Sequence, residues 1–191
     1  MIPKILLISF RKKLFDVPDE RKMHHSLVPR LGGIAFKPVI FFSIVFAIGI
    51  DIITGHGDII KAVDCNIPEL LFLYCAVLTL YIIGIADDLI GVRYRAKFVV
   101  QIACAIMFIA GDIWVGNLHG LLGLWELSPY IGYPLTILLV VFIANAINLI
   151  DGIDGLASGL SSIALFIYGI AFIILHQYLH AMLAFATLGV L

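Results

Sequence analysis

Long apolar runs separated by short polar stretches dominate the chain. Runs of about membrane-spanning length occur near residues 34–53, 70–86, 98–115, 131–147 and 157–175, and a sixth begins near 180. The runs are continuous and do not alternate as barrel strands do, and helices satisfy their own backbone hydrogen bonds in lipid. The pattern predicts an all-α fold, a polytopic transmembrane helical bundle in a single domain over residues 1–191, with five full spans and a partial C-terminal one.

Basic residues gather at two places along this pattern. They precede or enter the first run, or follow the second: Lys4, Arg11, Lys12, Lys13, Arg21, Lys22, Arg30, Lys37, Arg93, Arg95 and Lys97. The positive-inside rule therefore predicts that the preamble 1–33 and a loop at about 87–97 are cytoplasmic. Alternation places a loop at about 148–159 on the same side. Loops at about 54–69 and 116–130, which hold Lys61 as their one basic residue, should face outward.

Composition supports the bilayer as the first partner. The chain is 62% hydrophobic and 13% charged, more apolar than a soluble domain requires. A net charge of −1 without a clustered basic surface predicts no nucleic acid partner. Cys65, Cys75 and Cys104 lack metal-ligand spacing, so we interpret them as structural. Small residues in the apolar runs, such as Gly84 and Ala144, would permit close helix contacts, including those of a homodimer.

Three polar clusters fall on the predicted cytoplasmic side. The first occupies residues 16–33 and includes Lys22, His24 and Arg30. Its basic side chains could bind a phosphate. A solvated juxtamembrane loop in contact with anionic lipids would have the same composition, so both interpretations stay open.

The second cluster is the pair Asp87-Asp88 at the end of an apolar run. Adjacent carboxylates repel each other and are costly to desolvate, so they require a nearby cation or bound protons. Magnesium would suit them, because it takes one or two protein carboxylates and completes its coordination with water and phosphate. A solvated helix end is the alternative.

The third cluster contains Asn145, Asn148, Asp151 and Asp154, which recur every three residues. A helical continuation would display them along one side. Glycines among them allow close backbone approach to a ligand, and oxygen side chains in this pattern suit a magnesium ion and a nucleotide. A helix C-cap with local Asx turns is the alternative interpretation.

These clusters resemble, in the same order, the motifs of the polyprenyl-phosphate sugar-1-phosphate transferases (glycosyltransferase family 4). That family includes undecaprenyl-phosphate N-acetylglucosaminyl 1-phosphate transferase and phospho-N-acetylmuramoyl-pentapeptide transferase types. Residues 16–33 resemble its first cytoplasmic loop, and Asp87-Asp88 its aspartate pair. Residues 145–159 are similar to its N-x-x-N-x-x-D-G-x-D-G-L signature.

The resemblance implies an enzyme, a magnesium-dependent phosphoglycosyltransferase of cell-envelope polysaccharide synthesis. The phosphate of undecaprenyl phosphate would attack the β-phosphorus of a UDP-sugar, UDP-N-acetylglucosamine or a similar amino sugar, and UMP would leave. The resemblance also implies a multi-pass protein of the inner (plasma) membrane whose active site faces the cytoplasm.

The resemblance assigns a role to each matching residue. Asn148 and Asp88 would be magnesium ligands, and Asp87 with Asp88 would orient the metal and the attacking phosphate. Asp151, counted with them as catalytic, and Asp154 would hold the nucleotide part. The remaining substrate-binding residues would be Asn145, Arg30, Lys22 and His24.

The sequence also departs from the family pattern. We expect a first span, a further acidic loop and a His-rich loop of the family to lie outside these 191 residues, and little turnover from this chain alone. His176 and His180 do not match the His motif, and we interpret them as an interfacial i, i+4 pair. The alternatives to a transferase are an inactive membrane fragment or pseudoenzyme and an ion-coupled transporter, although no inverted repeat is evident.

Overall fold

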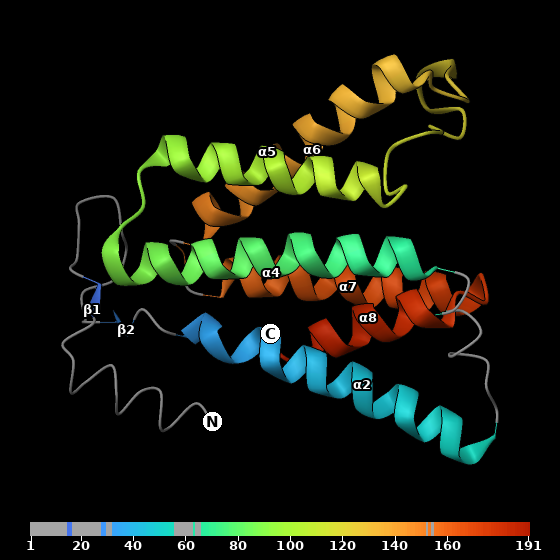
Figure 1. The fold of residues 1–191 in the computed structure, drawn as a ribbon, viewed down its shortest axis with the longest axis horizontal. Helices are drawn as coiled ribbons and strands as arrows, with labels where there is room; N and C mark the ends of the chain where they lie inside the picture. Colours follow the sequence, from blue (N-terminus) through green and yellow to red (C-terminus); the bar gives the residue numbers. More distant parts are fainter. Residues whose placement is uncertain are drawn as a thin grey trace. The chain divides into compact units, whose positions relative to one another are not determined.

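The computed structural model describes residues 15–16, 28–29, 32–55, 63, 66–151, 153 and 155–191 (Figure 1). The helices are α2 (Phe36–Thr54), α4 (Ile67–Ile90), α5 (Tyr94–Ala110), α6 (Pro129–Ile150), α7 (Leu156–Ile174) and α8 (Tyr178–Leu188). Short 3-10 turns occur at η1 (Gly32–Ala35) and η2 (Leu121–Gly123). The strands β1 (Phe15–Asp16) and β2 (Val28–Pro29) form a two-residue antiparallel pair. The predicted helical fold is thus confirmed over the described residues, apart from this short pair.

Four helical segments are long and apolar enough to cross a membrane: Gly33–Thr54, Ile67–Ile90, Pro129–Ile150 and Leu156–Ile174. Each covers one of the predicted runs. The run predicted at 98–115 forms α5, but this helix has 17 residues and ends at Ala110. Two residues later, Asp112 has a positive φ of 63°, which is not helical. The helix α8 is apolar but shorter. Within the described part of the chain, the predicted count of five full spans is therefore not confirmed.

Large apolar side chains cover the outsides of these helices. Phe42 is 68% exposed, Ile53 86% and Leu149 81%. The fully buried positions include the small residues Ala76 and Ala105, each 0% exposed. Small residues between helices and large apolar residues outside suit a lipid environment, where burial of apolar surface does not drive helices together. With the four long apolar helices, this surface identifies a multi-pass membrane protein.

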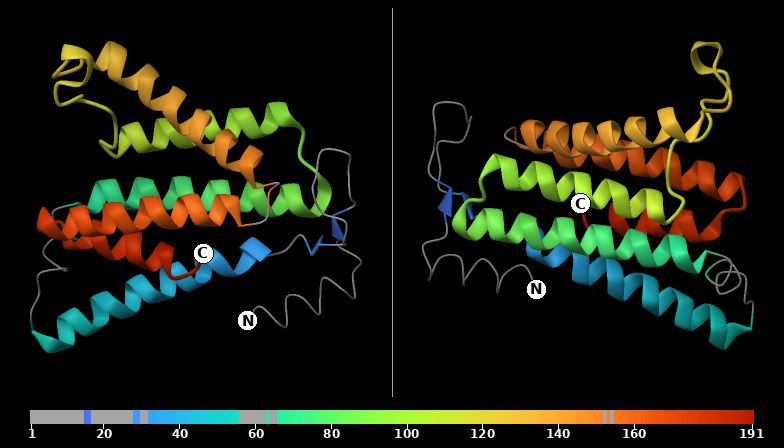
Figure 2. Two further views of the ribbon diagram at one scale, coloured as in Figure 1. Left: turned by 180° about the vertical axis from the view of Figure 1, so that it is seen from behind. Right: turned by 45° about the horizontal axis from the view of Figure 1, so that its top comes forward.

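The described residues divide into two compact units, and the first takes its residues from Met1–Asn66 and Ile150–Leu191. In it α7 and α8 pack as a helical hairpin, and α8 also contacts α2 (Figure 2). A Cβ atom at Gly169 of α7 would come within 2.7 Å of Phe185 Cζ on α8. The missing side chain therefore allows the two helices to approach closely.

His176 and His180, which belong to the first unit, do not share a helix, contrary to the i, i+4 prediction. The helix α7 ends at Ile174, and His176 lies in the following turn with a positive φ of 57°. Its Nδ1 lies 3.0 Å from the Tyr178 hydroxyl. His180 is inside α8, where its ring lies 5.3 Å from that of Phe172.

The second unit is Ile67–Leu149. Its helices α4 and α5 run side by side in opposite directions (Figure 1), and Cys104 Sγ of α5 donates to the Ala76 carbonyl of α4 at 3.4 Å. The helix α6 crosses α5 (Figure 2). The loop before α6 is hydrogen-bonded to α6, because the Val115 N–H donates to Thr136 Oγ1 at 2.9 Å. Whether residues 1–191 form one domain, as predicted, stays a prediction.

Candidate functional site

The turn between α4 and α5 is built around Asp87. The Gly91 N–H donates to the Asp87 backbone carbonyl at 2.9 Å, and Gly91 has a positive φ of 68° that lets the chain reverse. The Val92 N–H donates to Asp87 Oδ1 at 2.9 Å. The Lys97 ammonium binds Asp87 Oδ2 at 2.5 Å. The carboxylate of Asp87 therefore ties the end of α4 to the start of α5.

The Asp87–Lys97 ion pair offsets two unfavourable helix-end charges. A carboxylate at the C-terminal end of α4 and a cation in the first turn of α5 each oppose the helix dipole. Each side chain is 29% exposed, so solvent screens the pair and its contribution to stability is about 1 kcal/mol at most. The sequence predicted that the paired aspartates require a cation, and for Asp87 that cation is Lys97.

Asp88 points in a different direction from Asp87, because successive residues of an α-helix are about 100° apart. It is half-buried, near the last turn of α4. The adjacent carboxylates thus have different surroundings. Asp87 is engaged at both oxygens within the turn, by the Val92 N–H and by the Lys97 ammonium.

The C-terminal part of α6 carries the two asparagines of the third cluster. Asn145 is half-buried, and its Nδ2 donates to Gln101 Oε1 at 2.8 Å and to the Val141 carbonyl at 2.7 Å. Asn148 follows three residues later on α6 and is exposed. The helix ends at Ile150, so the predicted stripe is helical over the two asparagines, and Asp151 lies in the turn that follows.

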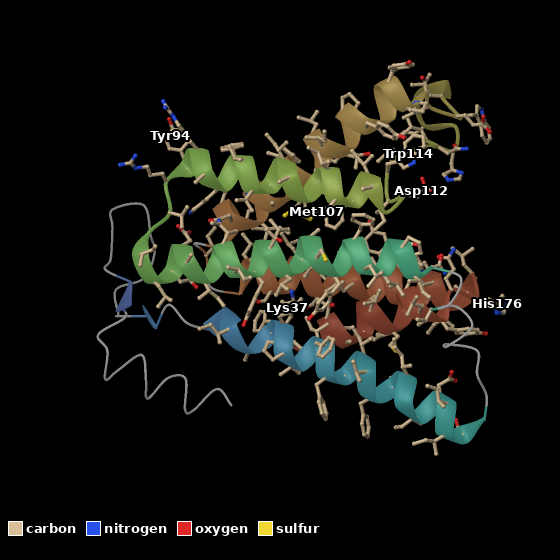
Figure 3. All side chains as sticks on the ribbon, in the orientation of Figure 1. Lys37, Tyr94, Met107, Asp112, Trp114 and His176 are labelled. Atoms are coloured by element: carbon tan, nitrogen blue, oxygen red, sulfur yellow. The ribbon has the colours of Figure 1, made fainter. Side chains whose placement is uncertain are left out.

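One helix, α5, connects the aspartate turn with the asparagine stripe. Lys97 and Gln101 are four residues apart on α5, so they lie on one face, one turn from each other. Lys97 contacts Asp87 of α4, and Gln101 contacts Asn145 of α6. In Figure 3, Tyr94 marks the N-terminal end of α5, and Asp112 and Trp114 mark the opposite end. Two motifs far apart in the sequence are therefore linked along one face of α5, at contacts one helical turn apart.

Lys97 and Gln101 were not among the site residues predicted from the sequence. Lys97 entered only as one of the basic residues that orient the chain. Gln101 stands in an apolar run between Val100 and Ile102, and it is 8% exposed. A buried amide in such a run is costly unless it is hydrogen-bonded, and that cost was the available signal.

The remaining predicted residues belong to the first unit or lie outside the described residues. Asp151 is exposed and belongs to the first unit, whereas the other described site residues belong to the second. Lys22, His24, Arg30 and Asp154 lie outside the described residues. Of the predicted site residues, the structure thus connects Asp87 of the second cluster with Asn145 of the third, through Lys97 and Gln101 of α5.

Two of the predicted residues in the second unit carry oxygen donors of the kind that magnesium binds. Among the described residues, no group of three His, Cys, Asp or Glu side chains could hold a metal ion. Magnesium does not require such a group, because one or two protein oxygens with water and substrate phosphates complete its octahedron. Asp88 supplies a carboxylate, and Asn148 supplies an amide oxygen.

Comparison with protein families gives a match over most of the chain. Residues 70–191 match the family model described as "Glycosyl transferase family 4". The matched region contains the aspartate pair and the whole asparagine and aspartate cluster.

Individual relatives carry more specific names. The chain is 32% identical over 165 residues to a Bacillus subtilis protein, "Probable undecaprenyl-phosphate N-acetylglucosaminyl 1-phosphate transferase", covering 85% of this chain and 42% of the relative. It is 36% identical over 155 residues to "Undecaprenyl-phosphate alpha-N-acetylglucosaminyl 1-phosphate transferase" of Escherichia coli K12, covering 79% and 37%. The chain therefore spans less than half the length of these relatives. No solved structure matches the chain.

Proposed function

The chain belongs to glycosyl transferase family 4, and on that basis we propose that the protein transfers N-acetylglucosamine 1-phosphate from UDP-N-acetylglucosamine to undecaprenyl phosphate. A phosphate oxygen of the lipid attacks the β-phosphorus of the nucleotide sugar. The bond from the β-phosphorus to the bridging oxygen breaks, and UMP leaves. The names of the relatives support this choice of substrates. The lipid diphosphosugar serves cell-envelope polysaccharide synthesis.

The observation that carries the proposal is the connection through α5. Lys97 on this helix binds Asp87, and Gln101, one turn later, binds Asn145. Phosphoryl transfer depends on positioning and charge neutralisation more than on a covalent intermediate. A cation, a carboxylate and side-chain amides linked along one face of α5 are groups of the required kind.

Each group has a part in this reaction. Asp88 and Asn148 would hold magnesium, which neutralises phosphate charge when bound. Asp87, fixed by Lys97, would orient the attacking lipid phosphate, and the Lys97 ammonium adds positive charge there. By the family resemblance, Asp151 and Asp154 would hold the nucleotide part, and Lys22, His24 and Arg30 would contact phosphates.

The membrane arrangement follows from charge and hydropathy. The isoprenoid tail stays in lipid beside the exposed apolar side chains of the helices. The turn between α4 and α5 is flanked by Arg93 and Arg95, which the positive-inside rule assigns to the cytoplasmic side of the plasma membrane. Water-soluble UDP-sugars are available on that side.

The test measures UMP release by the full-length protein in membranes supplied with undecaprenyl phosphate and UDP-N-acetylglucosamine. Release should stop when EDTA removes divalent cations and return with magnesium. Asp88→Asn and Asn148→Ala should each lower the rate by about 100-fold or more at unchanged expression. A panel of other UDP-sugars would test the choice of sugar.

The matched control is Asp112→Asn. Asp112 lies just beyond the opposite end of α5, and its Oδ1 accepts from Trp114 Nε1 at 2.9 Å, a bond that an asparagine oxygen can also accept. Asparagine also tolerates the positive φ at this position. This variant should retain its full rate. Unaltered rates in Asp88→Asn and Asn148→Ala would refute the assignment.

A further inference from the structure

The orientation of the Asn145 side chain is fixed by a group that can only accept hydrogen bonds. The Val141 carbonyl oxygen lies 2.7 Å from Asn145 Nδ2. The side chain therefore turns its NH2 group, and not its oxygen, toward that carbonyl. The same nitrogen lies 2.8 Å from Gln101 Oε1, so both N–H groups of Asn145 are used.

This arrangement also fixes the orientation of Gln101. If the Gln101 amide were reversed, its NH2 group would face the NH2 group of Asn145, and two donors would oppose each other. Gln101 is 8% exposed, and a buried donor without an acceptor is costly. The polarity of the Val141 carbonyl thus sets the orientation of both side-chain amides.

The consequence is that Asn145 presents Oδ1 as its remaining polar group. An acceptor in this position can receive a hydrogen bond from an N–H or O–H group of a ligand. Without the contact to Gln101, the Asn145 amide would be held only by a carbonyl of its own helix and would be free to adopt other rotamers.

We infer that Gln101 is a positioning residue, which holds Asn145 in the one orientation that offers Oδ1 to a donor group of the UDP-sugar. The inference rests on the proposed function. It extends the binding machinery to a buried residue of α5 that touches no substrate itself. Its partner Asn145 makes the contact.

The experiment compares two substitutions of Gln101 in the full-length protein. Gln101→Met keeps the length of the side chain and removes the acceptor, and we expect KM for UDP-N-acetylglucosamine to rise by about 5- to 30-fold with a smaller change in kcat. Gln101→Glu keeps an acceptor oxygen for the Asn145 NH2 group at nearly the same side-chain size. This conservative variant should recover most of the affinity. An unchanged KM in Gln101→Met would overturn the inference.

A double-substitution cycle separates positioning from a general structural role. Asn145→Ala alone should raise KM, and adding Gln101→Met should raise it no further, because Gln101 acts through Asn145. Two losses that multiply would show that Gln101 acts independently and would overturn the inference. A rise in the magnesium requirement at constant KM for the UDP-sugar would overturn the choice of ligand.

Thr136→Val is the matched structural control. It removes an interaction of similar length, between the Val115 N–H and Thr136 Oγ1 at 2.9 Å, and Thr136 is 6% exposed. This bond is made by the first half of α6, more than two turns before Asn145. KM should stay unchanged in this variant, and an equal rise would mean that loosening of the unit explains the effect. Absence of UMP release by the unaltered protein would refute the proposed function itself, whereas normal release with an unaffected Gln101→Met variant would refute this inference alone.

Discussion

Replacement of Lys97 by methionine separates the structural role of the Asp87–Lys97 pair from its proposed catalytic role. Methionine keeps an unbranched apolar stem and removes the charge. At an effective dielectric constant of about 20, unit charges about 4 Å apart attract by about 4 kcal/mol. Because both side chains are 29% exposed, solvent reduces the net contribution of the pair to about 1 kcal/mol or less.

The helix dipole works in the opposite direction. Lys97 lies in the first turn of α5, where a cation is unfavourable. Removing its charge should therefore raise the free energy of unfolding by about 0.3–1 kcal/mol through this effect. The two terms nearly cancel. We therefore expect the free energy of unfolding of Lys97→Met to change by less than about 1 kcal/mol. UMP release should fall by about tenfold or more, because the cation beside the attacking phosphate is gone.

Unfolding can be followed by circular dichroism in mixed detergent micelles, and UMP release can be measured on the same preparations. Arg95→Met is the control, because it removes a cation from the same turn of α5 that does not pair with Asp87. The Arg95 Nε–H instead donates to the Tyr94 hydroxyl at 3.0 Å. This control should keep its rate. If Lys97→Met retained normal release, or if both variants lost activity equally, the proposed role of Lys97 would be wrong.

Two further predictions concern glycines at close contacts. In Gly132→Ala, the new Cβ would lie 2.5 Å from Trp114 Cζ3, so we expect a loss of about 1–3 kcal/mol of stability and altered tryptophan fluorescence. The control is Gly84→Ala, which should lose no stability because its new Cβ would have no atom within 4 Å. In Gly169→Ala, the new Cβ would meet the Phe185 ring and separate α7 from α8, which should lower the thermal unfolding midpoint. Gly159→Ala on the same helix, also with nothing within 4 Å, should not lower it, and an equal effect in both would contradict the packing argument.

Much of the fold could be read from the sequence because helix formation in lipid is a local property. Four of the predicted apolar runs became helices of membrane-spanning length. Asp87 and Asp88 were expected at the end of a span, and they lie near the end of α4. The family motifs gave the candidate site residues by their order and spacing, and the roles of these residues stay predictions.

The exact extent of α5 could not be read in this way. The apolar run continues to Val115, but the helix stops at Ala110. Beyond it, the Val115 N–H bonds to Thr136 on α6, a residue 21 positions away. Gly111 and Asp112 follow the helix directly, and hydropathy averaged over the whole apolar run did not resolve this local stop signal.

By itself, the sequence determined which segments are helical and which polar residues are available for chemistry. Tertiary structure decided the partners of those residues: Lys97 for Asp87, and Gln101 for Asn145. The physical reason is that hydropathy records whether a side chain suits lipid or water. A hydrogen bond between helices depends on which helix faces pack together and on how far along each helix axis the two residues lie. Gln101 and Asn145 are 44 positions apart, and the sequence between them carries no periodic signal of that contact.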